Sequence, residues 1–163
     1  MTMTTLPTPH DPASDALRWM LQTSAEGLQS LVKDMDEEEM SARPQGLAPV
    51  VWQIGHVAVF DAQLACWAGH SVDIPLGWEA LFAKGASGEG PLPTMESVMA
   101  LLRKANEELV KLCATDLGRP VITSSGQTAP LSSQLVFHLF HRGYHAGKIM
   151  TLRALLGKPR LLG

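Results

Sequence analysis

The chain is poor in cysteine and has no long apolar run. Its only two cysteines, Cys66 and Cys113, are too few for a disulfide framework and lack zinc-finger spacing, so we expect both to be small core residues. No apolar run reaches the roughly 18 residues that crossing a membrane requires. The N-terminus has neither the basic region nor the apolar segment of a secretory signal. These absences predict a cytoplasmic protein with no membrane partner.

Positive charge is also scarce. Lysine and arginine number 13 against 16 acidic residues, which gives a net charge of −3 and argues against a nucleic-acid partner. The apolar share of 45% and the charged share of 18% are typical of a folded globular chain. At 163 residues, one domain is expected. We predict a flexible tail over residues 1–10 and one helical bundle domain over residues 11–163.

Four segments have the apolar periodicity of helices. In the first, Leu17, Leu21 and Leu28 recur at steps of four and seven residues, which keeps them on one face of a helix. Caps and breakers then set the ends of these segments. The predicted helices cover residues 11–34, 49–68, 94–113 and 131–156, and the second is apolar on most of its faces. The pattern predicts an all-α, antiparallel four-helix bundle.

The segments between these helices are rich in glycine and proline. The long connection between the second and third helices holds one short predicted helix over residues 78–82. Residues 118–130 contain a turn signal that is compatible with a short hairpin, but the pattern supports no sheet. The acidic run from Asp34 to Glu39 is interpreted as the solvated end of the first helix.

Histidine is the residue type that carries chemistry here. His141 and His145 are four residues apart on the last predicted helix, so they share one face. A third histidine, His56, lies within the apolar second helix, where an unpartnered imidazole would cost about 1–3 kcal/mol. Three neutral imidazoles with an open fourth position are a known pattern for a catalytic zinc site. We therefore predict that the three bind one divalent ion.

Other residues near this face leave alternatives open. His138 shares the histidine stripe, but it lies too far along a straight helix from His145 for both to reach one ion. The helix therefore offers either His138 with His141 or His141 with His145; we favour the second pair and expect His138 to be packed or to support the ligands. Asp61 and Tyr144 are weak catalytic candidates, as is His138. Gly143 and Gly147 suggest close approach of another helix or a ligand. An ordinary hydrogen-bonded histidine remains the alternative for His56.

These residues resemble the DinB/YfiT-like superfamily of metal-dependent bundle proteins, over about residues 11–157. The matching motifs are Gly55-His56, His141-x-x-x-His145-x-Gly147-x-Ile149 and Leu152-Arg153-x-Leu155-x-Gly157. The resemblance implies a bundle with a right-handed twist and an unusual helix order. It also implies a divalent metal on His56, His141 and His145, and frequent homodimers. The sequence departs from the family at Lys148, where relatives usually carry glutamine.

The resemblance also implies candidate functions. Relatives include thiol S-transferases that use low-molecular-weight thiols, which makes a metal-dependent thiol transferase the first interpretation. A metal-dependent hydrolase and a non-catalytic metal-binding bundle, structural or a stress-response sensor, are the alternatives. Histidine ligands suit zinc, nickel and iron alike, so they leave the metal open.

Overall fold

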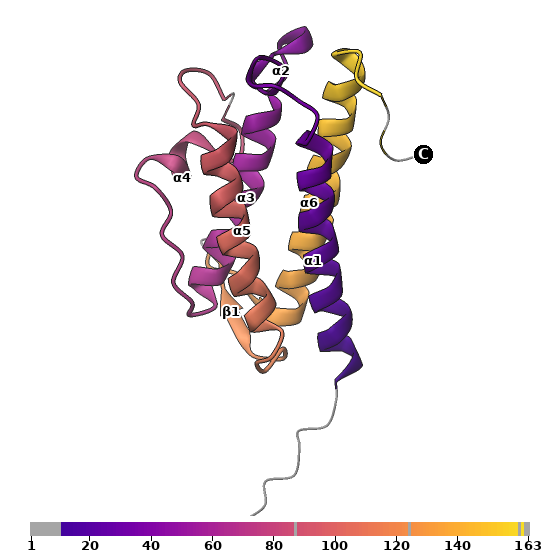
Figure 1. Ribbon diagram of the computed structural model, residues 1–163. Coiled ribbons are helices and arrows are strands. Elements are labelled where there is room, and N and C mark those ends of the chain that lie inside the picture. Colours follow the sequence, from indigo (N-terminus) through magenta and orange to yellow (C-terminus); the bar gives the residue numbers. More distant parts are fainter. Residues whose placement is uncertain (1–10, 87, 124, 160, 162–163) are drawn as a thin grey trace, which may run out of the picture.

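Four long helices build the protein. The computed structural model describes residues 11–86, 88–123, 125–159 and 161, so the predicted tail over residues 1–10 lies outside the described part. The long helices are α1 (Pro12–Val32), α3 (Val50–Trp67), α5 (Met95–Leu112) and α6 (Leu131–Leu155). Each bound lies within two residues of the prediction, and the all-α bundle is confirmed (Figure 1).

The helix ends follow the capping residues of the sequence. Asp11 is the N-cap of α1, and its side chain accepts a hydrogen bond from the backbone N–H of Ala13. Pro12 follows as the first residue of the helix. Thr94 accepts likewise from the N–H of Ser97. After α6, Gly157 has a φ of 74°, a left-handed conformation that glycine adopts without steric cost. Local chemistry therefore sets these three boundaries.

The order of the helices around the bundle differs from their order in the chain. α3 packs against α5 and α6, and α1 packs against the same two, so α1 and α3 occupy opposite corners. Contacts between α3 and α6 run in opposite chain directions, since Gln53 meets His145 and Asp61 meets His138. α1 and α6 run in the same direction, because Arg142 reaches Leu21 and Arg153 reaches Leu31.

The long connection after α3 follows from this topology. α3 and α5 descend side by side in Figure 1, so the chain must return along the whole bundle between Trp67 and Met95. The short helix α4 (Trp78–Leu81) lies in this connection, as predicted. Phe82 follows it and is 1% exposed, which anchors the connection on α3.

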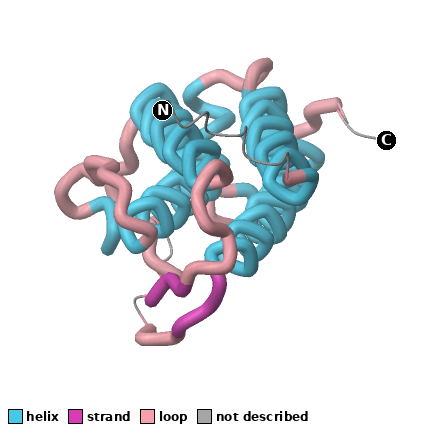
Figure 2. Tube along the Cα trace, turned by 90° about the horizontal axis from the view of Figure 1, so that it is seen from below, coloured by secondary structure: helices cyan, strands magenta, loops and turns pink. Residues whose placement is uncertain are grey.

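Two small elements depart from the sequence prediction. The acidic run forms its own helix α2 (Glu37–Ser41), begun by reciprocal hydrogen bonds between Asp36 and Glu39, and η1 (Pro44–Gly46) follows it. The expectation of no sheet is wrong, because β1 (Pro120–Ile122) pairs antiparallel with β2 (Thr128–Pro130). This hairpin lies at one end of the bundle, at its edge (Figure 2).

Burial is greatest along α3. Most of its residues are inaccessible to solvent, as its nearly continuous apolar sequence predicts. Cys113 is buried as expected, but Cys66, at the end of α3, is exposed, which corrects its assignment to the core. Within the described residues, no helix is both long and apolar enough to cross a bilayer.

Candidate metal centre

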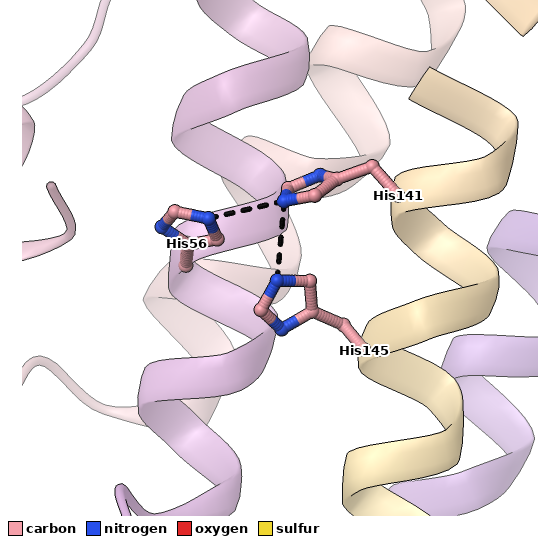
Figure 3. A group of neighbouring side chains, drawn as sticks. All are labelled: His56, His141 and His145. Carbon is pink, nitrogen blue, oxygen red and sulfur yellow. Dashed lines mark hydrogen bonds between the residues drawn. The ribbon is translucent and has the colours of Figure 1, made fainter. Parts of the chain in front are cut away.

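Three imidazoles meet between α3 and α6. His56 comes from α3, and His141 and His145 come from α6, one turn apart (Figure 3). The Nε2 atom of His141 lies 3.1 Å from Nε2 of His56 and 3.1 Å from Nε2 of His145. All three ligand atoms lie within 4.8 Å of one another. We call these three residues the histidine triad.

The outer nitrogen of two triad rings is fixed by a hydrogen bond. Nδ1 of His56 lies 2.6 Å from the carbonyl oxygen of Phe82, and Nδ1 of His145 lies 2.7 Å from Oε1 of Gln53. Both partners are acceptors, so both Nδ1 atoms carry the proton. In neutral rings the lone pairs are then on Nε2, which faces the centre of the triad.

This donor set fits a divalent ion. One Nε2–H on His141 cannot serve both neighbouring lone pairs fully, whereas a cation between the rings satisfies all three nitrogens. Nitrogens bound to one tetrahedral ion lie about 3–3.5 Å apart, close to the two 3.1 Å separations. Hydrogen bonds from the outer nitrogens to a carbonyl or amide oxygen are the usual support of ligating histidines.

Burial keeps the triad neutral, which is the ligating form. Burial is the largest cause that lowers the pKa of His141 to about 4 and that of His145 to about 3. It also lowers the pKa of His56, which the hydrogen bond to Phe82 partly offsets. No proton therefore has to leave these rings for a cation to bind near neutral pH.

Aromatic side chains wall the triad on most sides. The ring of Trp52 stacks on His56 at 5.0 Å between centroids, and Phe60 contacts His141 at 4.7 Å. Phe137 stacks on His141 at 6.4 Å and is itself 49% exposed. His56 and His145 are buried, whereas His141 is only half-buried. The triad is thus reached from solvent on the His141 side.

A glycine on α3 lets the connection approach the triad. A Cβ at Gly55 would collide with the ring of Phe82, whose carbonyl holds His56. At Gly143 and Gly147 the predicted close approach of another helix is wrong within the described chain, since a Cβ at either would meet no atom within 4 Å, and the alternative of a ligand there stays a prediction. The tight packing is therefore at the residue before His56, on the opposite helix.

One turn away, a second buried polar group links α3 to α6. Oδ1 of Asp61 lies 2.9 Å from Nδ1 of His138, and Oδ2 accepts from Nε of Arg142 at 2.8 Å. Arg142 also donates to the carbonyl of Leu21 and to Ser24 on α1. We call Asp61, His138 and Arg142 the aspartate cluster; all three are fully buried.

The charge of Asp61 is held by its partners. Burial opposes the carboxylate, but Arg142 and His138 outweigh it and keep the pKa of Asp61 below its usual range. Asp61 turns to His138 rather than to the triad, so the carboxylate nearest the triad in sequence is paired elsewhere. His138 likewise lies outside the group of convergent imidazoles.

Sequence reasoning missed Gln53 and Arg142. Gln53 is a lone amide in an apolar helix, three residues before His56, and this position was the available signal. Arg142 lies four residues after His138, so the two share a face toward the single carboxylate of α3. The carbonyl of Phe82 gave no signal, because backbone groups carry no residue identity.

Tyr144 and Lys148 lie at the outer edge of the site. The ring of Tyr144 meets His145 edge-on at 5.2 Å and is 53% exposed. Nζ of Lys148 lies 4.8 Å from the centre of the Tyr144 ring, a cation–π contact. After burial and neighbouring imidazoles, the charge of Lys148 adds to the lowered pKa of His145. The ammonium is therefore held beside the triad by an aromatic ring.

Comparisons with known proteins identify the family and support the fold. The sequence matches the DinB superfamily over residues 20–149. The chain belongs to the DinB superfamily. A comparison with curated proteins finds no match. The fold is similar to a solved structure of YfiT from Bacillus subtilis, with a TM-score of 0.67 and 15% identity, over 96% of this chain and 94% of that one. That protein is described as a probable metal-dependent hydrolase with an unusual four-helix bundle topology.

Proposed function

We propose that this DinB protein is a metal-dependent enzyme whose divalent ion, zinc, nickel or iron, is held by His56, His141 and His145. The observation that carries the proposal is the convergence of three Nε2 atoms, two of them fixed as lone-pair donors by Phe82 and Gln53. When bound, such an ion supplies Lewis acidity that lowers the pKa of a thiol or water ligand.

The residues around the triad either orient its imidazoles and exclude water or leave an open side for a substrate. Gln53 and the Phe82 carbonyl orient two imidazoles, and Trp52 and Phe60 exclude water from two sides. The half-buried ring of His141 leaves the remaining side for a substrate. Among the described residues, no carboxylate, thiol or further imidazole joins the group as a fourth ligand, which favours an open catalytic site over a closed structural one.

A low-molecular-weight thiol is our first candidate for the exogenous ligand, which makes the reaction a thiol S-transfer. A thiolate is the species that binds a metal and attacks an electrophile. The ammonium of Lys148, beside the triad, favours an approaching anion over a cation. The lysine that departs from the family pattern therefore supports an anionic ligand at this site.

Hydrolysis is the second candidate, favoured by the description of the similar YfiT structure. A water ligand in place of the thiol would need a base. His138 is the nearest imidazole outside the triad, and its Nδ1 is held by Asp61. A non-catalytic metal-binding bundle, structural or sensory, is the third reading, and it predicts that no exogenous ligand reaches the ion.

The test loads the purified protein with cobalt(II) and adds a thiol. Glutathione, bacillithiol or mycothiol at millimolar concentration is expected to add a sulfur-to-cobalt charge-transfer band and to release a proton. A spectrum that no thiol changes would overturn the thiol-transferase proposal in favour of hydrolysis or a structural ion. A changed spectrum without faster conjugation to electrophiles would favour the sensor.

We also propose a homodimer through the face that α1 and α6 share. Trp19 and Phe140 are 66% and 70% exposed there and line one apolar groove of about 510 Å³. Gly143 lies in the same groove, with open space where a Cβ would be. In a two-fold dimer the bulky rings of one copy would fill the glycine-lined part of the other.

Sedimentation at micromolar concentration tests the dimer. The wild-type chain is expected at about twice 17.6 kDa, and Phe140→Glu at the monomer mass. Leu76→Glu is the matched control, because Leu76 is fully exposed in the long connection, away from this groove. A monomeric wild type across this range contradicts the dimer.

A further inference from the structure

A pocket of about 390 Å³ lies between the hairpin, α3 and α6, next to the triad. Its volume is within the range of small-molecule sites. Phe60 and Phe137 line it, and both also contact the ring of His141. These two rings are therefore a wall that the pocket shares with the triad. We call it the hairpin pocket.

The lining combines aromatic side chains with uncharged polar ones. The hairpin and the start of α6 contribute hydroxyl and amide groups, among them Thr123, Gln127 and Ser133. Trp67 adds a third aromatic ring to Phe60 and Phe137 in the lining. Of the described residues that line the pocket, none is a lysine, arginine, aspartate or glutamate. Such a lining suits a neutral molecule that joins an aromatic or alkyl body to a hydrogen-bonding group.

One buried polar atom of this pocket lacks a partner. His138 lines the pocket and is 0% exposed, and its Nε2 has no hydrogen-bond partner among the described residues. Nδ1 of the same ring is bound to Asp61, and the two nitrogens of an imidazole point away from each other. Leaving such an atom unsatisfied costs about 1–3 kcal/mol.

The charges behind His138 set what its free nitrogen can do. The carboxylate of Asp61 accepts from Nδ1 of His138, and its own charge is balanced by the guanidinium of Arg142. The neutral ring donates through Nδ1 to Asp61, which leaves a lone pair on Nε2. Nε2 of this tautomer is therefore an acceptor on a ring that a carboxylate orients, and the described residues that line the pocket include no lysine, arginine, aspartate or glutamate.

We propose that the hairpin pocket binds the neutral part of the substrate and that Nε2 of His138 accepts a hydrogen bond from its O–H or N–H group. Phe60 and Phe137 would pack on the apolar body and bring it beside the triad. This deepens the function proposed above and rests on it for the reaction, whereas the binding itself does not require the metal.

Phenol and anisole form a matched pair of probes, because they share the ring and only phenol has a donor. The full-length protein, with and without zinc, is titrated with each while the ¹⁵N resonances of the His138 ring are followed by NMR. Phenol is expected to bind with a Kd on the order of 1 mM and to shift Nε2 more than Nδ1. Anisole is expected to bind about tenfold more weakly and to leave Nε2 unshifted.

A pocket-filling variant locates the binding without disturbing the aspartate cluster. Ser133→Phe places a ring in the pocket from an exposed position on α6 and is expected to weaken phenol binding at least about tenfold. Thr151→Phe, exposed on the same helix and outside the pocket, is the control and should bind phenol as the wild type does.

Three results would overturn the proposal: equal binding of anisole, an Nε2 resonance that phenol leaves in place, or phenol binding that Ser133→Phe does not weaken. Zinc content, measured separately, reports on the proposed metal site. If zinc fails to bind but phenol shifts Nε2 in the metal-free protein, the proposed function fails and the pocket stands.

Discussion

The histidine triad and the aspartate cluster are both buried between α3 and α6, one turn apart, yet they are built on opposite principles. In the aspartate cluster each carboxylate oxygen meets a donor, and the guanidinium meets a carboxylate, a carbonyl and a hydroxyl. In the triad, the lone pairs on Nε2 of His56 and His145 both face the single Nε2 of His141, which cannot donate fully to both. In the aspartate cluster the buried carboxylate is balanced by a guanidinium, whereas the triad needs a cation between its nitrogens.

The same comparison separates stability from function. The aspartate cluster ties three helices together, because Arg142 also reaches α1 through Leu21 and Ser24. The triad joins only α3, α6 and the connection that carries Phe82. We therefore expect changes in the aspartate cluster to act on folding and changes in the triad to act on metal binding.

Breaking the aspartate cluster should have the largest effect. Asp61→Ala leaves the buried guanidinium of Arg142 without its anion, which is expected to lower the free energy of unfolding by about 3–5 kcal/mol. Urea denaturation followed by circular dichroism measures it. Asp73→Ala, on the exposed connection, is the control and should change stability by no more than about 0.5 kcal/mol. A loss of similar size in both variants would refute the structural role of the aspartate cluster.

Removing a triad ring should instead abolish metal binding. Zinc at 100 times its Kd is expected to stabilise the wild type by about 2.7 kcal/mol, and His56→Ala, His141→Ala and His145→Ala should each lose that gain. Metal analysis of the folded fraction provides the second readout, in which His138→Ala should keep most of the metal. Full zinc retention by folded His56→Ala would sink the ligand assignment.

The sequence predicted the bundle well because helix periodicity and capping are local. Asp11, Thr94 and Gly157 determine helix ends through contacts within a few residues. The spacing of His141 and His145 likewise makes their convergence a property of one helix. Adding His56 rested on the cost of an unpartnered imidazole in an apolar helix, and the resemblance to known proteins then supported it, because spacing alone does not place α3 against α6.

What the sequence left open depends on contacts between distant segments. The hydrogen bond from His56 to the Phe82 carbonyl spans 26 residues, and that from Arg142 to Leu21 spans 121. Gly143 and Gly147 were expected at a close contact, yet the residue that needs glycine is Gly55, because Phe82 arrives from the long connection. Such approaches follow from topology, which periodicity does not encode.

Removing support from the triad, while keeping all three ligands, sharpens the comparison. Gln53→Ala removes the acceptor that orients His145 and is expected to weaken zinc affinity about 10- to 100-fold. Gln53→Glu keeps an acceptor oxygen and should recover most of the affinity. Gln63→Ala, on the same helix but bonded to Glu79, is the control for competition titrations. Equal affinities in Gln53→Ala and Gln63→Ala would show that the amide does not support the site.

In the metal-free protein, lowering the pH should reduce the free energy of unfolding in two stages, one from the triad and one from carboxylates. We expect this effect to be smaller than those of the substitutions above. Burial lowers the pKa of His141 from 6.5 to about 4, so the unfolded chain takes up that proton first. The stability from the neutral ring is present above about pH 6.5 and is lost as the pH falls through about 4. Arg153 lowers the pKa of Asp34 from 3.8 to about 2, so its contribution is lost only below about pH 4. Urea midpoints measured between pH 7 and pH 3 should therefore fall in two stages, and His141→Gln should flatten only the upper one. An unchanged slope in that variant would mean that His141 does not contribute to the response to mild acid.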